Sequence, residues 1–311
     1  MIVLSRRTGL LAAACLAALR PAGAAEAPFD FSPEQAGRPH AARSERAIAT
    51  IPQWTRLVVP GRLTVAINPA GGPPLTSYAT DTHTVVGADA DIASVLADAL
   101  GLWLDLVPTA WADWPLGLAS GKYDAVISNV GVTEQRKEKF DFSTYRAGLH
   151  GFFVATNSAV GAIKEPKDSA GLRIIVGAGT NQERILLEWS RQNVAAGLKP
   201  LLLQYYDDQP TGLLALASGR ADVIVQPHAQ LVFLAARDRT IRRVGTLSAG
   251  WPLRSDVAVT TRKGAGLAEA LTVAINELIE NGTYAKVLAR WGLEEEALAR
   301  SETNPPGLPK F

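Results

Sequence analysis

One arginine and one glycine-rich turn are the features of this sequence best suited to binding an anion. Arg136 follows a short apolar run at 125–127 and a polar stretch at 128–135. A guanidinium binds a carboxylate through two parallel hydrogen bonds, which a lysine cannot do. The next three residues are charged as well, so a solvated helix surface is the alternative explanation for Arg136.

The glycine-rich turn at 177–183 follows an apolar run at 173–176 and precedes a helical pattern. Its glycines let backbone N–H groups approach an anion at the helix start, and Thr180 with Glu183 fits a capping box. The turn lacks the Lys-Ser/Thr pair of a phosphate loop and the full glycine pattern of a dinucleotide site, so nucleotide binding is disfavoured. We expect this turn to face the same cleft as Arg136.

Residues for catalysis or metal binding do not occur in a suitable arrangement. The sequence has no serine nucleophile motif, and its one cysteine, Cys15, excludes intrachain disulfides and thiolate metal sites. Only His228 is expected near a cleft; the other histidines are interpreted as solvated or packed. The carboxylates of Asp89, Asp91 and 294–296 are assigned to helix starts and surfaces. We therefore predict no catalytic residue, no metal site and no cofactor.

The elements that position these residues belong to an α/β fold. Short apolar runs at 63–67, 125–127, 173–176 and 223–225 alternate with helical patterns such as 91–100, which predicts a largely parallel sheet. The length of 311 residues suits two lobes. The net charge of +1, without a basic stripe, argues against nucleic acid as a partner.

An internal repeat supports the two lobes. Residues 118–127 are echoed 98 positions later by 216–225, and each copy has a helix end, a glycine, an aspartate and a buried strand. Ligands of open α/β sheets collect beyond the carboxyl ends of the strands. The residues that follow the two copies, Ser128 with Asn129 and Gln226 with His228, are therefore expected to face a cleft. Trp111 precedes the first repeat helix and either forms a wall of this cleft or packs; Trp114 is assigned to packing.

The two ends of the chain carry no apolar periodicity of a folded lobe. Arg6 and Arg7, an apolar run at 9–19 and small residues at 22–24 predict a signal peptide at 1–24, of the Sec or the twin-arginine type. Residues 25–56 are expected to form an irregular arm, and 301–311 an irregular tail. No transmembrane segment is predicted, because no apolar stretch reaches the length needed to cross a bilayer.

From Gly61 to about Gly292 the chain resembles the family 3 solute-binding proteins, the periplasmic receptors of polar amino acid ABC transporters. The resemblance is carried by 87–92, 118–124, 128–136, 140–143, 179–180 and 282–286 with Trp291. It implies a two-lobed periplasmic binding protein fold of type II. One lobe would comprise 57–148 with 250–300 and the other 152–246, with two hinge crossings near 148–152 and 246–251.

The resemblance also implies a site. Arg136 would bind the carboxylate of the ligand, helped by Ser128, Asn129 and Gly131, while Thr180 and Asn181 would hold it from the second lobe. Asn68, Trp111, Gln226 and His228 complete the predicted set of ligand-binding residues.

Two departures from the family pattern bear on the ligand. Pro227 stands where amino acid receptors commonly have an acid for the α-ammonium, and Asn68 stands where some have Asp. The stacking aromatic after the first strand is missing, although Tyr78 or Trp111 could replace it. Burying an ammonium group without a charge partner costs several kcal/mol. We therefore hypothesise a small organic carboxylate or a modified amino acid as the ligand.

The predicted function is that of a monomeric, non-enzymatic periplasmic receptor that closes around its ligand and docks on an ABC permease in the inner membrane. The alternative is a periplasmic enzyme on the same fold, such as a cyclohexadienyl-type dehydratase. Such an enzyme needs a buried Glu, Asp or His with a shifted pKa in the cleft, and the sequence offers only His228 for this role.

Overall fold

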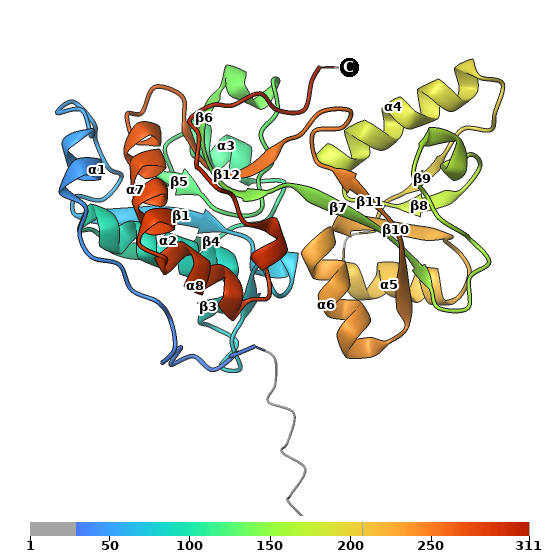
Figure 1. The fold of residues 1–311 in the computed structure, drawn as a ribbon, viewed down its shortest axis with the longest axis horizontal. Coiled ribbons are helices and arrows are strands. Elements are labelled where there is room, and N and C mark those ends of the chain that lie inside the picture. The colour runs from blue at the N-terminus through green and yellow to red at the C-terminus, as the bar shows by residue number, and fades with distance from the viewer. Residues whose placement is uncertain (1–28, 207, 311) are drawn as a thin grey trace, which may run out of the picture.

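The computed structural model describes residues 29–206 and 208–310 and forms two α/β lobes, which confirms the predicted fold (Figure 1). The predicted signal peptide lies outside the described residues. The first lobe has a five-stranded sheet of order β4-β1-β5-β12-β6. Its strands are β1 (Arg62–Ile67), β4 (Trp103–Pro108), β5 (Ala125–Val126), β6 (Phe140–Ala147) and β12 (Asp256–Arg262). Its helices are α2 (Ala88–Leu100), α3 (Trp114–Ala119), α7 (Ala268–Glu280) and α8 (Thr283–Arg290).

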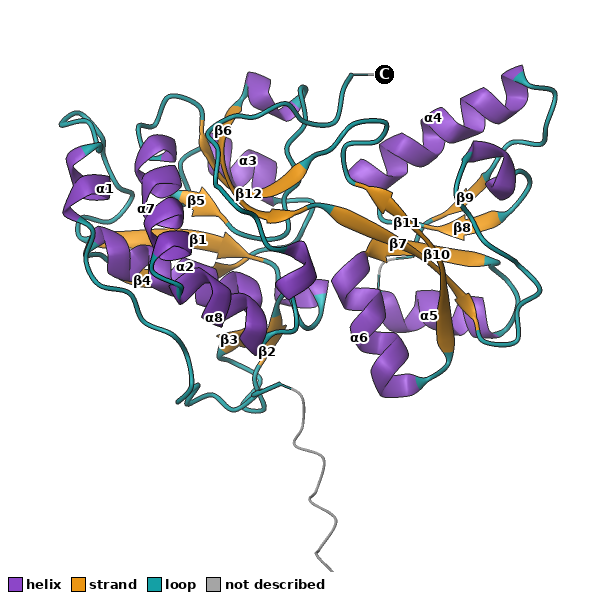
Figure 2. Ribbon diagram, viewed as in Figure 1, coloured by secondary structure: helices purple, strands orange, loops and turns teal. Residues whose placement is uncertain are grey.

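The second lobe repeats this plan with a sheet of order β11-β7-β10-β8-β9. Its strands are β7 (Leu149–Ala155), β8 (Arg173–Ile175), β9 (Leu202–Gln204), β10 (Val223–Pro227) and β11 (Ile241–Ser248). Helix α4 (Asn181–Ala195) lies on one side of this sheet, and α5 (Gln209–Ala217) and α6 (His228–Asp238) lie on the other (Figure 2). A short hairpin of β2 (Ser77–Tyr78) and β3 (Val85–Val86) follows β1.

The sheets are only half parallel, so the prediction of a largely parallel sheet was wrong in this respect. In the first lobe β1 runs parallel to β4 and β5, whereas β12 is antiparallel to β5 and β6. In the second lobe β7 is antiparallel to β10 and β11. The antiparallel strands are those that lead into and out of the two crossings between the lobes, where the chain leaves one sheet and returns to it.

The two copies of the repeat build the same corner in each lobe. Gly121 and Gly219 adopt left-handed φ angles of 76° and 71° after α3 and α5. Asp124 then accepts hydrogen bonds from the backbone N–H groups of Val58 (2.8 Å) and Thr64 (2.9 Å). Its counterpart Asp222 accepts from Arg173 on the neighbouring strand. Each aspartate thus fixes the start of the strand that leads to the cleft.

The two crossings run side by side. The first is Gly148 between β6 and β7, and the second is the segment 249–255 between β11 and β12. Ala249 N donates to Gly148 O at 2.9 Å, and Gly148 N donates to Ser255 O at 3.2 Å. A Cβ on residue 148 would lie 2.7 Å from the Cβ of Ala249, so the close approach requires glycine.

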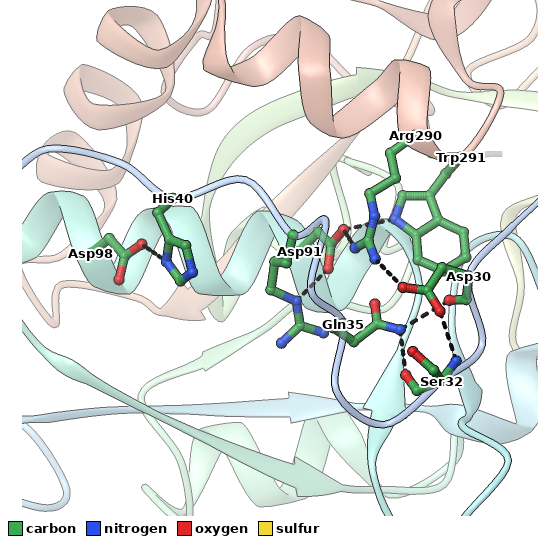
Figure 3. Close-up of polar contacts among 9 residues, drawn as sticks. Asp30, Ser32, Gln35, His40, Asp91, Asp98, Arg290 and Trp291 are labelled. Carbon is green, nitrogen blue, oxygen red and sulfur yellow. Dashed lines mark hydrogen bonds and ion pairs between the residues drawn. The ribbon is translucent and has the colours of Figure 1, made fainter.

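The arm before the first lobe is more ordered than expected. It contains the short helix α1 (Glu45–Ala49), which is capped by Ser44 and packs against α7. Asp91, on the first turn of α2, anchors the arm and is fully buried, which corrects its assignment to a solvated surface. It accepts from Arg38 Nε at 2.7 Å. It also accepts from Arg290 Nη1 at 2.5 Å and from Trp291 Nε1 at 2.8 Å (Figure 3).

The arm also reaches the second lobe. The ring centroid of Phe29 lies 5.6 Å from that of Trp291 and 5.5 Å from that of Phe233 on α6. Phe31 lies 6.4 Å from Phe233. Four aromatic rings therefore connect the arm, the C-terminal part of the first lobe and the second lobe.

The tail at 301–310 contains no helix or strand, but it pairs with the first lobe. Thr303 forms a β-bridge with Ser143, and Leu308 forms one with Thr133 and is fully buried. The backbone pairing with the first lobe satisfies its polar groups and explains its order. Among the described residues, no helix has the length and apolar character required of a membrane span.

Candidate functional site

A cavity of about 680 Å³ lies between the two lobes. Nine of the ten predicted ligand-binding residues line it, six from the first lobe and three from the second: Asn68, Trp111, Ser128, Asn129, Gly131, Arg136, Thr180, Asn181 and Gln226. That they bind the ligand stays a prediction. Tyr78 is not among the lining residues and is 44% exposed as a residue, so Trp111 is the better placed of the two aromatics.

Arg136 connects the two lobes across this cavity. It begins the 3-10 turn Arg136–Glu138, and its backbone N–H donates to Thr133 Oγ1 at 2.9 Å. Its Nη1 donates to Gly131 O at 2.9 Å and to Asn181 Oδ1 at 3.0 Å, and its Nη2 donates to Gly179 O at 3.2 Å. The guanidinium is therefore held by the cleft and is not on a solvated helix face.

Two indole rings hold the other side of Arg136. The guanidinium carbon lies 5.5 Å from the ring centroid of Trp111 and 5.5 Å from that of Trp114. Trp114 belongs to the core, as its assignment to packing predicted, whereas Trp111 lines the cavity. The rings attract the cation through their quadrupoles and restrict its rotamers.

The electrostatics of Arg136 favour an anion. Burial, together with the nearby charge of Arg184, lowers the pKa of Arg136 to about 10, so it remains protonated at pH 7. Within the described residues Arg136 takes part in no ion pair, and its hydrogen-bond acceptors are neutral carbonyl and amide oxygens. A guanidinium with only neutral partners is able to form an ion pair with a carboxylate.

The glycine-rich turn supplies the second-lobe wall. Thr180 caps α4 by accepting from Glu183 N at 3.2 Å, while the Glu183 carboxylate accepts from Gly179 N at 2.6 Å. The Asn181 side chain bonds Arg136 through Oδ1 and donates from Nδ2 to Ala249 O at 3.0 Å. Asn181 therefore connects the guanidinium of Arg136 to the second crossing of the chain.

The first-lobe wall is held by local hydrogen bonds. Ser128 Oγ accepts from Asn68 N at 2.9 Å, and Asn68 Oδ1 accepts from Ala70 N at 3.1 Å. Asn129 adopts a left-handed φ of 53°, and its Oδ1 accepts from Arg146. Gly131 must be small, because a Cβ there would lie 2.6 Å from Asn181 Nδ2.

His228 is the predicted site residue that the structure does not bring to this cavity. It starts α6 and lines a second, mainly apolar cavity of about 630 Å³. Its Nε2 lies 3.0 Å from Arg243 Nη1, and its Nδ1 lies 3.7 Å from Glu296 Oε1. Gln226, by contrast, lines the main cavity and accepts from Gln209 Nε2 at 3.0 Å.

The sequence reasoning missed two buried titratable groups of the cavity wall. Asp89 is fully buried, although it was assigned to a solvated helix start, and burial raises its pKa against the opposing effects of Arg146 and the Tyr145 hydroxyl. His150 on β7 is 4% exposed, and burial lowers its pKa to about 4. Alanine, valine, isoleucine and leucine fill nine of the thirteen positions along 88–100, and this is the sequence signal that could have identified α2 as buried.

Glu296 was also misassigned to a surface. It is buried, forms an ion pair with Arg146 and lies near His228. The arginine also bonds Asn129, so this buried pair supports the cavity wall from behind.

The comparisons with known proteins agree with this geometry. The family model described as bacterial extracellular solute-binding proteins, family 3, matches residues 63–294. The L-cystine-binding protein TcyJ of Escherichia coli (strain K12) is 33% identical over 235 residues, covering 74% of this chain and 83% of that protein. The cyclohexadienyl dehydratase of Pseudomonas aeruginosa is 27% identical over 151 residues, 48% of this chain and 53% of that enzyme. The structure of an ancestral arginine-binding protein bound to arginine is 28% identical, with a TM-score of 0.63 over 74% of this chain and 98% of that chain.

Proposed function

Because the chain belongs to family 3 of the bacterial extracellular solute-binding proteins, we propose that it is the periplasmic, monomeric receptor of an ABC importer. Its ligand is a small molecule that carries a carboxylate, either an amino acid or a related organic acid. The observation that carries this proposal is Arg136, a cleft guanidinium that both lobes contact and that has only neutral acceptors.

Ligand capture follows from the division of the site between the lobes. The first lobe supplies the guanidinium, and the second supplies Thr180 and Asn181 at the start of α4. A carboxylate gains hydrogen bonds from both sides only when the lobes are closed, so binding favours the closed arrangement. The closed lobes then form the surface that an inner-membrane permease recognises.

The relatives support a ligand of amino acid size. TcyJ is named for L-cystine, and the ancestral structure holds arginine. The cavity volume of about 680 Å³ falls in the range of small-molecule sites and exceeds what one small amino acid needs. Pro227 in the wall leaves no acid at that position for an ammonium group, which supports an organic acid or a modified amino acid.

Calorimetric titration of the purified mature protein with amino acids and organic acids tests the proposal. Arg136→Gln should weaken binding of any carboxylate ligand by about 2–5 kcal/mol, roughly 30- to 4,000-fold in Kd. Arg191→Gln is the matched control, because Arg191 lies on the exposed face of α4 and its ion-pair partner among residues 29–206 and 208–310 is Glu188. Equal affinities of wild type and Arg136→Gln would refute the proposal that Arg136 binds the carboxylate of the ligand.

A cyclohexadienyl-type dehydratase is the second candidate function. It is favoured by the dehydratase relative and by the two buried titratable groups of the wall, Asp89 and His150. Incubation with a cyclohexadienyl carboxylic acid, followed by absorbance, separates the two functions. The receptor proposal expects binding without turnover, and turnover lost in His150→Phe would replace it with the enzyme.

A further inference from the structure

His150 lies in the wall of the ligand cavity beside Pro227. The two residues are direct partners in the antiparallel pairing of β7 with β10, and both line the cavity. Directly opposed residues of antiparallel strands have their side chains on the same face of the sheet, about 5 Å apart. Proline has neither a polar side chain nor an N–H, so the imidazole is the polar group at this point of the wall.

The imidazole has no partner in the described part of the protein. Both ring nitrogens are buried, and neither makes a hydrogen bond. A buried polar group without a partner costs free energy comparable to a lost hydrogen bond, so such groups in native proteins call for an explanation. A ligand in the cavity that His150 lines provides one.

The charge state of His150 determines which ligand groups its ring can bind by hydrogen bonds. Burial lowers its pKa to about 4, against the raising effect of Glu296 and with the lowering effect of Arg146. At pH 7 the ring is neutral and offers one N–H donor and one acceptor nitrogen. It can bond a hydroxyl or an amide, but it supplies no negative charge for an ammonium group.

The carboxylates among the lining residues do not supply that charge either. Asp89 is fully buried and accepts from Tyr145 Oη at 2.7 Å. Asp208 caps α5 at the exposed rim, where it accepts from Thr211 N at 2.7 Å and Thr211 Oγ1 at 2.8 Å. The cavity thus combines one cation, Arg136, and a neutral imidazole with two carboxylates that already have hydrogen-bond donors from the protein.

We propose that His150 hydrogen-bonds a second, uncharged polar group of the ligand, so that the ligand class is a carboxylate with a nearby hydroxyl or acylated nitrogen. This inference rests on the proposed carboxylate receptor function. It makes His150 the residue that discriminates between ligands that Arg136 binds equally well.

A matched set of probes tests the inference by calorimetry: L-phenylalanine, L-3-phenyllactate, N-acetyl-L-phenylalanine and 3-phenylpropanoate, with L-leucine, 2-hydroxy-4-methylpentanoate, N-acetyl-L-leucine and 4-methylpentanoate as an aliphatic set. Within a set, the wild type should bind the hydroxy or the N-acetyl acid about tenfold more tightly than both the amino acid and the unsubstituted acid. The two favoured members distinguish a hydroxyl from an acylated nitrogen.

His150→Phe should remove this preference, so that the hydroxy, the N-acetyl and the unsubstituted acid of a set bind with similar affinity. His83→Phe, which changes an exposed histidine between β2 and β3, is the control and should keep the preference. His150→Leu, with its thermal midpoint measured, is the second variant. Both His150 variants should fold, because the ring has no protein partner to leave behind.

Three results would overturn the inference. An unchanged preference in both His150 variants would show that the imidazole does not contact the ligand. Tightest binding of the amino acids by the wild type would show that the second polar group of the ligand is a charged ammonium group. In both cases the carboxylate receptor stands, because carboxylates still bind. Failure of every carboxylate in both sets to bind the wild type would refute the proposed carboxylate function and this inference together.

Discussion

Acidification should destabilise this protein in part through the buried imidazole of His150. Its pKa is about 4 in the folded chain, against an unperturbed value of 6.5. Between these two values the unfolded chain binds a proton that the folded chain does not, so stability falls as pH falls. Integrating the proton uptake of this site from pH 7 to pH 4.5 gives a loss of about 2 kcal/mol in the free energy of unfolding.

The neighbours of His150 fix the sign of this effect. Glu296 raises the pKa of His150 and Arg146 lowers it, but burial has the largest effect. Arg146 and His228 hold the pKa of Glu296 below its usual value despite burial, so this carboxylate remains ionised over the same pH window. The expected fall in stability between pH 7 and pH 4.5 is therefore assigned to protonation of His150 and not to protonation of Glu296.

The assay is urea unfolding followed by tryptophan fluorescence at several pH values from 7 to 4.5, for wild type and His150→Phe. Other carboxylates titrate in both proteins and cancel in the difference. The wild type should lose about 2 kcal/mol more than the variant over this range. Parallel stability profiles would refute the neutral, buried imidazole on which this reasoning depends.

Three further substitutions test other parts of the structure. Asp91→Asn leaves Arg38 and Arg290 without their buried carboxylate, so thermal unfolding should show a free energy of unfolding lower by about 3–5 kcal/mol. The control Asp98→Asn, in a more exposed pair with His40, should lower it by less than about 1 kcal/mol. Gly131→Ala places a methyl group 2.6 Å from Asn181 Nδ2, so ligand affinity measured by calorimetry should fall. The thermal midpoint should stay near that of the control Gly161→Ala, where a Cβ meets nothing within 4 Å. Phe233→Ala removes the second-lobe ring that contacts Phe29 and Phe31, and should lower stability by about 1–3 kcal/mol in urea unfolding; no change would mean that the arm does not hold the second lobe.

The sequence predicted the parts of the site that local pattern determines. The repeat at 118–127 and 216–225 located the strand ends, and the glycine-rich turn located the start of α4, because helix caps and left-handed glycines are local features. The residues beyond these ends, such as Ser128 and Asn181, consequently line the cavity. The direction of β6 and β12 was not predictable in this way, because a short apolar run looks the same in a parallel and an antiparallel pair.

Burial by distant segments explains the residues that were missed. Carboxylates at a helix start are usually solvated, but the arm and the end of α8 cover Asp91, while β6 and the hairpin region cover Asp89. His150 was interpreted as solvated or packed, and packing is what the structure shows. Its place opposite Pro227 depends on the register of β7 with β10, two strands that are far apart in the chain.

The arginines in and beside the two lobes differ in whether an acid pairs with them. Arg146 pairs with Glu296, Arg290 with Asp91 and Asp30, and Arg38 with Asp91, so these acids already have cationic partners in the arm and the cavity wall. Arg136 differs because the groups around it in the described chain are neutral oxygens and indole rings. These partners orient the guanidinium without neutralising it, so its charge remains available in the cavity between the lobes. A cation pre-oriented in this way loses little conformational entropy on binding. A carboxylate that binds there gains an ion pair with Arg136, because no acid of the described chain forms one.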